Sequence, residues 1–144
     1  MTIAIQEVSF ASEEYMQILK LRYEILRRPL GLEVSAKDVA TDDKEFHIAA
    51  SDDGKIIGCV VLRPITHDII KLRQMAVYDA YQGKGIGTKL VRYAEELASS
   101  RGFKTMETHA RTVAQSFYQK LRYVAEGEAF IEATVPNIKM LKSL

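Results

Sequence analysis

Three glycines at alternate positions form the segment of this sequence whose spacing most clearly suits ligand binding. They lie in Tyr81-Gln82-Gly83-Lys84-Gly85-Ile86-Gly87-Thr88, where an apolar pattern that predicts a helix over residues 85–100 begins. Because glycine has no Cβ, the chain can adopt positive φ there and bring successive N–H groups close to a ligand. The first turn of a helix adds unpaired N–H donors and the positive end of its dipole. The segment therefore predicts an anion site, most often one for phosphate, and Lys84 and Lys89 add positive charge nearby.

Two common phosphate loops do not match these residues. A P-loop needs Gly-Lys followed by Ser or Thr, yet Gly83-Lys84 is followed by Gly85. A dinucleotide fingerprint that begins at Gly83 needs a third glycine where Thr88 stands. A glycine-rich turn without a ligand stays open as the plain alternative, although a simple turn rarely needs three glycines and a helix start.

The turn lies between a predicted strand over 69–77 and the helix, and a second strand is expected near 104–110. This unit should cross over right-handedly and place its two strands in parallel. The other expected elements are a strand over 3–10, a helix over 12–28, a hairpin of 46–50 and 55–62 with the turn Ser51-Asp52-Asp53-Gly54, a helix near 112–121, and strands near 123–132 and 137–142. Together they predict one α/β (α+β) domain over residues 1–144. Its mixed, mostly antiparallel sheet should have about six to seven strands, with helices on both faces.

The glycine segment also carries a resemblance to a known family. Gln82-Gly83-Lys84-Gly85-Ile86-Gly87 is similar to Gln/Arg-x-x-Gly-x-Gly/Ala, the pyrophosphate-binding signature of the GNAT family of N-acetyltransferases. Ala114-Gln115-Ser116-Phe117-Tyr118 resembles the family's later Ala-x-x-Phe/Leu-Tyr helix, and the order of elements is similar over nearly the whole chain. The resemblance implies a GNAT-like fold and an acetyl-CoA-dependent N-acetyltransferase in which the amine attacks directly.

The resemblance also implies where the co-substrate acetyl-CoA binds. Its pantetheine arm would pair with the backbone of a strand that diverges from its parallel neighbour, and its pyrophosphate would rest on N–H groups of Gln82, Gly83, Gly85, Gly87 and Thr88. The N–H near Val77 would polarise the thioester carbonyl. The full set of implied coenzyme-binding residues is Met75, Ala76, Val77, Gln82, Gly83, Lys84, Gly85, Ile86, Gly87, Thr88, Gln115, Phe117 and Tyr118.

Catalytic roles follow from the same resemblance. Tyr118 is similar to the tyrosine that protonates the departing thiolate in many members, and the alternative is that it only packs beside Phe117. The base that deprotonates the acceptor ammonium is not singled out. Glu107 and His109 share one face of a strand and are candidates, with a water relay as the default.

The acceptor side is less defined by sequence. Arg22, Tyr23 and Arg27, with the loop after Pro29, occupy the region that shapes the acceptor pocket in this family, although solvated charge on an amphipathic helix explains them nearly as well. Asn137 to Met140 could close that pocket. Small amines, amino sugars, antibiotics and protein or peptide amines all stay open as acceptors.

Two departures from the family pattern stand out. An asparagine commonly stands where this chain has Arg111, which puts any side-chain contact from there to pantetheine in doubt. The Gly-Phe that usually follows the tyrosine helix is Arg122-Tyr123 here, so the helix must be capped differently.

Composition narrows the classes of partner. A net charge of +1 gives no strong field that would attract nucleic acid or an anionic membrane, and no stretch approaches the about 20 apolar residues of a membrane span.

Cys59, the single cysteine, lies in an apolar run, which indicates a core thiol. His47 and His67 have no ligand-like spacing, so no metal is expected, and a cytoplasmic location follows by default.

Two rival functions come from other classes. A non-catalytic acyl-CoA sensor would keep the turn but transfer nothing, and the presence of Tyr118 argues mildly against it. A bare interaction domain would not bind CoA at all. Pairing through the final strands, common in this family, would give a homodimer.

Overall fold

The computed structural model describes all 144 residues and contains one seven-stranded sheet in the order β1-β2-β3-β4-β5-β7-β6. All neighbouring strands are antiparallel except β4 and β5, which are parallel. The expected mixed, mostly antiparallel sheet is therefore confirmed. The strands are β1 (Ile3–Val8), β2 (Phe46–Asp52), β3 (Lys55–Pro64), β4 (Ile69–Val77), β5 (Thr105–Arg111), β6 (Val124–Glu132) and β7 (Val135–Ser143).

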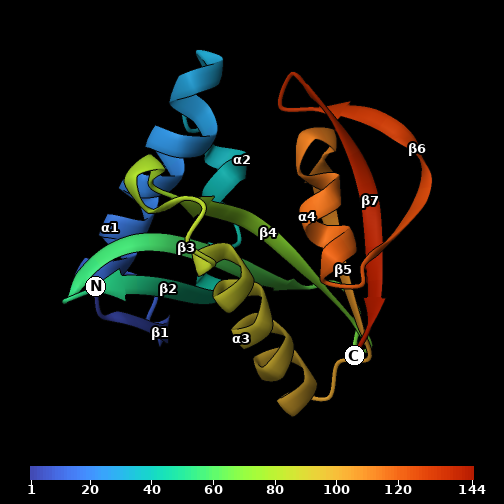
Figure 1. Cartoon of the computed structure of the whole chain (residues 1–144), viewed down its shortest axis with the longest axis horizontal. Coiled ribbons are helices and arrows are strands. Elements are labelled where there is room, and N and C mark those ends of the chain that lie inside the picture. Colours follow the sequence, from blue (N-terminus) through green and yellow to red (C-terminus); the bar gives the residue numbers. More distant parts are fainter.

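Helices cover both faces of this sheet, as expected (Figure 1). They are α1 (Glu13–Arg22), α2 (Ala36–Val39), α3 (Ile86–Ser100) and α4 (Gln115–Lys120). The cluster of buried side chains under α3 and α4 includes Leu90 and Tyr118, and a second cluster under α1 includes Ile18 and Leu21. No helix of the chain has the length and apolar character that crossing a membrane requires.

The expected helix over 12–28 is not one regular helix. Ser12 caps α1 by accepting the N–H of Tyr15 at 3.1 Å, but regular winding ends at Arg22. The chain then widens into a π-helical turn, Tyr23–Arg27, and tightens into a 3₁₀ turn, Arg28–Leu30. Because Pro29 has no N–H to continue the hydrogen-bond ladder, the segment ends at Gly31 with a left-handed φ of 70°.

Cys59 lies on β3 in the cluster under α1 and is fully buried. Burial raises the pKa of its thiol to about 12, so the side chain is a protonated core residue. The prediction of a core thiol is confirmed.

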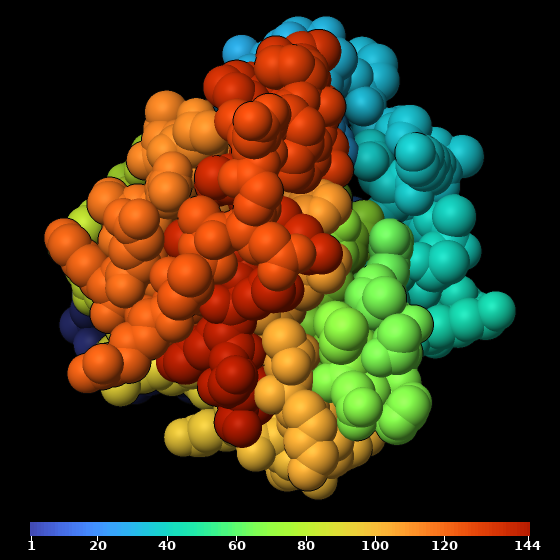
Figure 2. All heavy atoms as spheres, turned by 90° about the vertical axis from the view of Figure 1, so that its right-hand side faces the viewer, coloured from blue at the N-terminus to red at the C-terminus, as the bar shows by residue number.

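The sheet splits between its two parallel strands. β4 and β5 pair only from Ile69–Thr105 to Leu72–Thr108, and beyond that point no pairing joins them. A bulge bends β4 just after the split, because Gln74 and Met75 lie opposite one residue of β3, and Gln74 has a φ of 53°. β5 instead continues along β7 as far as Arg111, and the C-terminal part of the chain with β6 and β7 forms much of the face seen in Figure 2. The result is an open wedge, visible in Figure 1 between β4 and the group of β5, β7 and α4.

Candidate active site

The glycine turn stands at the N-terminus of α3, beside the wedge. Gly83 and Gly85 have φ values of 75° and 79°, and a Cβ at either would meet nothing within 4 Å. Gly87 has ordinary helical geometry, but a Cβ there would lie 3.3 Å from the ring of Phe117. Two glycines are thus required by backbone conformation and the third by the close approach of α4.

The N–H groups of this turn are free. Residues 83–88 have no backbone or side-chain acceptor for their N–H groups, and Gly85 offers no capping side chain to α3. These donors stand at the positive end of a helix of 15 residues. The cluster has the donors and the dipole that a diphosphate requires.

Gln82 differs from its expected role at this turn. Its N–H donates to the carbonyl of Asp79 at 3.2 Å, so it is not free for a phosphate. Its side-chain amide donates to the carbonyl of Val77 at 2.9 Å and to the carboxylate of Asp79 at 3.1 Å. Gln82 therefore fixes the shape of the turn while it also lines the cleft beside it, and its contact with pyrophosphate stays a prediction.

A cleft of about 480 Å³ runs from the turn along β4. Met75, Ala76 and Val77 form one wall, the turn forms another, and Phe117 lies between them. Tyr78 donates its N–H to Ile57 on β3 at 3.0 Å. Because successive N–H groups of a strand point to opposite edges, the N–H of Val77 points into the wedge. Lys84 and Gln115, both expected to bind the coenzyme, do not line this cleft.

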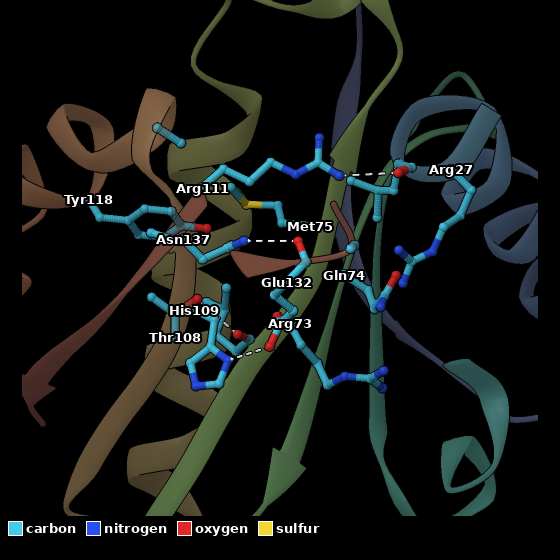
Figure 3. Close-up of a pocket in the computed structure, with 15 residues that line it drawn as sticks. Arg27, Arg73, Gln74, Met75, Thr108, His109, Arg111, Tyr118, Glu132 and Asn137 are labelled. Atoms are coloured by element: carbon cyan, nitrogen blue, oxygen red, sulfur yellow. Dashed lines mark hydrogen bonds and ion pairs between the residues drawn. The ribbon is translucent and has the colours of Figure 1, made fainter. Parts of the chain in front are cut away.

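A second cavity, of about 260 Å³, lies in the wedge (Figure 3). Its lining joins four parts of the chain: the π-helical turn after α1, the bulge of β4, the end of β5 with Tyr118 of α4, and the turn between β6 and β7. Met75 and Ala114 line this cavity and also the cleft beside the glycine turn. The two hollows therefore meet within the wedge.

Tyr118 lines the second cavity where the hollows meet. Its ring is 5% exposed and packs edge-on against Phe117 and Tyr123. Burial raises the pKa of Tyr118 to about 12, and the hydroxyl of Thr108 partly offsets this effect. The phenol is thus protonated at neutral pH and can donate to a thiolate formed beside it.

His109 and Glu107 are placed differently, although both lie on β5. His109 lines the cavity, and its Nδ1 lies 3.0 Å from a carboxylate oxygen of Glu132 and 3.2 Å from Nζ of Lys71. Glu107 lines neither hollow, and its carboxylate lies 3.4 Å from Nζ of Lys139. Of the two candidate bases, the structure brings only His109 to the cavity.

Arg22 is buried beneath the acceptor-side loop. Its guanidinium donates to Asp42 at 2.8 Å and to the carbonyl of Asp38 at 2.9 Å. Burial alone would raise the pKa of Asp42, but a hydrogen bond from Tyr15 and the charge of Arg22 outweigh it and hold this pKa below its usual range. With its hydrogen bonds made internally, Arg22 fixes the loop. It also lines a hollow under α1 and α2, and its contact with substrate stays a prediction.

The other two predicted acceptor residues are more open. Tyr23 and Arg27 line the same hollow under α1 and α2 as Arg22, and there Arg27 pairs with Asp38 at 2.7 Å. Arg27 also lines the second cavity. Further residues of the second cavity were not expected as site residues, since their places depend on the bulge and on strand pairing: Arg73, Gln74, Thr108, Arg111 and Glu132. Asn137, which does line the cavity, also shapes the turn before β7 through bonds to Glu132 and Val135 carbonyls.

The helix after Tyr118 is capped without glycine. Arg122 itself adopts a φ of 74°, so that Tyr123 can donate its N–H to the carbonyl of Tyr118 at 3.0 Å. Tyr123 is then buried, and its hydroxyl donates to Glu95 at 2.8 Å. No group of three or more His, Cys, Asp or Glu side chains is arranged to hold a metal ion.

Comparisons with known proteins give the class of this protein. A family model described as the acetyltransferase (GNAT) family matches residues 12–123, and the chain belongs to this family. It is therefore an acyltransferase of the acetyl-CoA-dependent class. The family expected from the glycine signature is confirmed.

The chain is also similar to individual proteins. An uncharacterized protein of Bacillus subtilis (strain 168), YyaT, is 29% identical over 127 residues, which cover 83% of this chain and 85% of that protein. A putative acetyltransferase of the same strain is 28% identical over 134 residues, which cover 88% and 90%. The crystal structure of a putative N-acetyltransferase from Lactobacillus plantarum superposes with a TM-score of 0.89 at 25% identity, covering 100% of this chain and 99% of that one. The GNAT-like fold is thereby confirmed.

A structure with the coenzyme bound shares this fold. It is a GNAT family acetyltransferase from Elizabethkingia anophelis with acetyl-CoA, which has a TM-score of 0.78 at 18% identity and covers 99% of this chain and 98% of that one.

Proposed function

We propose that this protein transfers the acetyl group of acetyl-CoA to an amine by direct attack of that amine on the thioester. The observation that carries the proposal is the meeting of two hollows inside one wedge: the cleft beside the free N–H groups of residues 83–88, and the cavity lined by Tyr118. A coenzyme in the first and an amine in the second would bring the reacting atoms together at the split of the sheet.

The turn and β4 supply the features that the coenzyme needs. The diphosphate would accept hydrogen bonds from the free N–H groups of residues 83–88, at the positive end of α3. The pantetheine arm would lie along Met75, Ala76 and Val77, whose edge no strand covers beyond Leu72. The acetyl end would then point past Met75 towards Tyr118.

The chemistry follows from the groups at this junction. The free amine attacks the thioester carbonyl, so that a C–N bond forms, and the N–H of Val77 donates to the oxygen that becomes negative. The C–S bond then breaks, and Tyr118 gives its proton to the departing thiolate. The nitrogen that attacked carries one proton more than the amide product does. Tyr118 takes up this proton, which restores its phenol.

His109 is the side chain best placed to accept the proton of the acceptor ammonium. It lines the cavity, and Glu132 and Lys71 surround its Nδ1. Glu107 lines neither hollow, and its carboxylate lies 3.4 Å from Nζ of Lys139 and 4.0 Å from Nε2 of His109. A water molecule between His109 and the amine would extend the reach of the imidazole.

Thiol release separates this function from a non-catalytic CoA sensor. We expect release of free CoA from acetyl-CoA in the presence of one or more amines of a panel, well above hydrolysis without amine. A thiol reagent can follow it, because Cys59 is fully buried and its raised pKa keeps it protonated. Binding of CoA in calorimetry without any amine-dependent release would identify a sensor, and no heat at all would exclude a CoA-binding protein.

A further inference from the structure

Arg111 is a half-buried cation in the second cavity for which the chain supplies no anion. One nitrogen of its guanidinium donates to the carbonyl of Leu26 at 3.1 Å, and no carboxylate lies within 4.0 Å of it. Burial lowers its pKa, and the charge of Arg27 lowers it further. In Figure 3 the side chain extends from β5 across the top of the cavity, and a dashed line marks its bond to the carbonyl of Leu26.

The other charged groups of this cavity have partners. Arg27 pairs with Asp38 at 2.7 Å, and Arg73 pairs with Glu45 at 2.9 Å. The single acid of the lining, Glu132, lies 3.0 Å from His109. Arg111 is therefore the one arginine of the cavity whose charge is not balanced.

The place of Arg111 decides which ligand would supply the missing charge. Arg111 lines the second cavity with Tyr118 and Met75, but it does not line the cleft beside the glycine turn. The phosphates of the coenzyme would lie at that turn. An anion at Arg111 would therefore belong to the acceptor.

We propose that the acceptor is a small amine that also carries a carboxylate, and that Arg111 binds this carboxylate. The proposal rests on the proposed acetyl transfer. A guanidinium has five N–H donors, and only one bond of Arg111 is to the protein, so a fork of donors is left for a planar carboxylate. Such a bond, in a partly desolvated cavity, would orient the molecule with its amine towards Tyr118.

The charge of the cavity disfavours other amines. A polycationic amine would bring further positive charge next to Arg111, which repels it. A phosphate dianion calls for a second cation, and the nearest one, Arg27, is already paired with Asp38. A volume of about 260 Å³ also suits a small molecule better than the surface of a folded protein.

The test compares matched acceptors and matched variants. The common amino acids are assayed for thiol release, each beside its carboxamide, which keeps the amine and loses the negative charge. An amide differs from its acid also in having a more acidic ammonium group, so rates for the two are not compared directly. The deciding quantity is the kcat/KM for the acid divided by that for the amide, and this ratio is compared between wild type and Arg111→Gln. Arg28→Gln is the control, because Arg28 is exposed, lines none of the described hollows and loses the same charge.

We expect Arg111→Gln to lower the acid-to-amide ratio by about tenfold or more, mainly through KM. Arg28→Gln should leave this ratio unchanged, and Arg111→Lys should restore part of it. The inference is overturned if wild type shows no preference for any acid, or if the preference survives in Arg111→Gln.

A binding measurement keeps this inference separate from the proposed function. Should no amine be acetylated, acetyl transfer fails, and the same acid and amide pairs are titrated into CoA-saturated protein by calorimetry. Tighter binding of acids that disappears in Arg111→Gln would still support the carboxylate site. Equal binding of acids and amides would reject it.

Discussion

Gly85→Asp is expected to weaken CoA binding by about 100-fold, or about 3 kcal/mol. Gly85 begins α3 with a φ of 79°, and the space that its Cβ would enter is open. Aspartate tolerates this left-handed conformation better than most residues, so the variant should fold. Its carboxylate would stand among the free N–H groups of residues 83–88, where it occupies the donors and repels a diphosphate. Calorimetric titration with CoA measures the loss.

Gly54→Asp is the matched control for this variant. Gly54 has a φ of 85°, and a Cβ there would also meet nothing within 4 Å. It lies in the turn between β2 and β3 and does not line the cleft. It should bind CoA like wild type. Unchanged CoA affinity in a folded Gly85→Asp protein would show that the coenzyme does not use this turn.

Tyr118→Phe is expected to lower kcat by roughly 100-fold with little change in CoA affinity. The substitution removes the hydroxyl that lines the cavity but keeps the ring that packs against Phe117 and Tyr123. Steady-state thiol release and CoA titration separate the two effects. Full turnover in this variant would remove Tyr118 from the mechanism.

Tyr123→Phe separates proton donation from packing. Tyr123 contacts Tyr118 and is buried, but it does not line either hollow. Loss of its hydroxyl, which bonds Glu95, should lower stability and leave kcat nearly unchanged. A kcat loss equal to that of Tyr118→Phe would indicate a packing effect.

The pH profile gives a further check on Tyr118. The proposed role needs the protonated phenol, which burial maintains up to its pKa of about 12. Tyr118 therefore loses the proton that it donates only as the pH rises through that value. Wild type should show no fall in kcat attributable to Tyr118 between pH 7 and about pH 10.

Local sequence signals predicted the elements and the turn well. The spacing of apolar residues predicted α3, the Asp53-Gly54 pair predicted the hairpin of β2 and β3, and the glycines predicted a helix start with free donors. These features depend on residues close together in the chain. The family resemblance then supplied the wedge between β4 and β5, which the structure contains.

Features that depend on distant residues were not predictable in this way. The bulge at Gln74 arises from the pairing of β4 with β3, and it decides which β4 side chains face the cavity. The buried network of Arg22 and Asp42 joins residues 20 positions apart, so nothing in the local pattern marks Arg22 as structural. In the sequence, Arg111 differs from the family pattern but carries no sign that it lacks an anion, which becomes visible only in three dimensions.

Three expectations from the sequence stay predictions. They are a single domain over residues 1–144, a cytoplasmic location and a homodimer formed through the final strands. A sedimentation measurement would address the last of these.

A crystal structure with acetyl-CoA tests the central claim most directly. We predict that the diphosphate lies within hydrogen-bond distance of N–H groups of residues 83–88, and that the thioester carbonyl lies beside the N–H of Val77, with the sulfur near the hydroxyl of Tyr118. Coenzyme bound elsewhere, or a glycine turn that stays empty at saturating acetyl-CoA, would contradict the account.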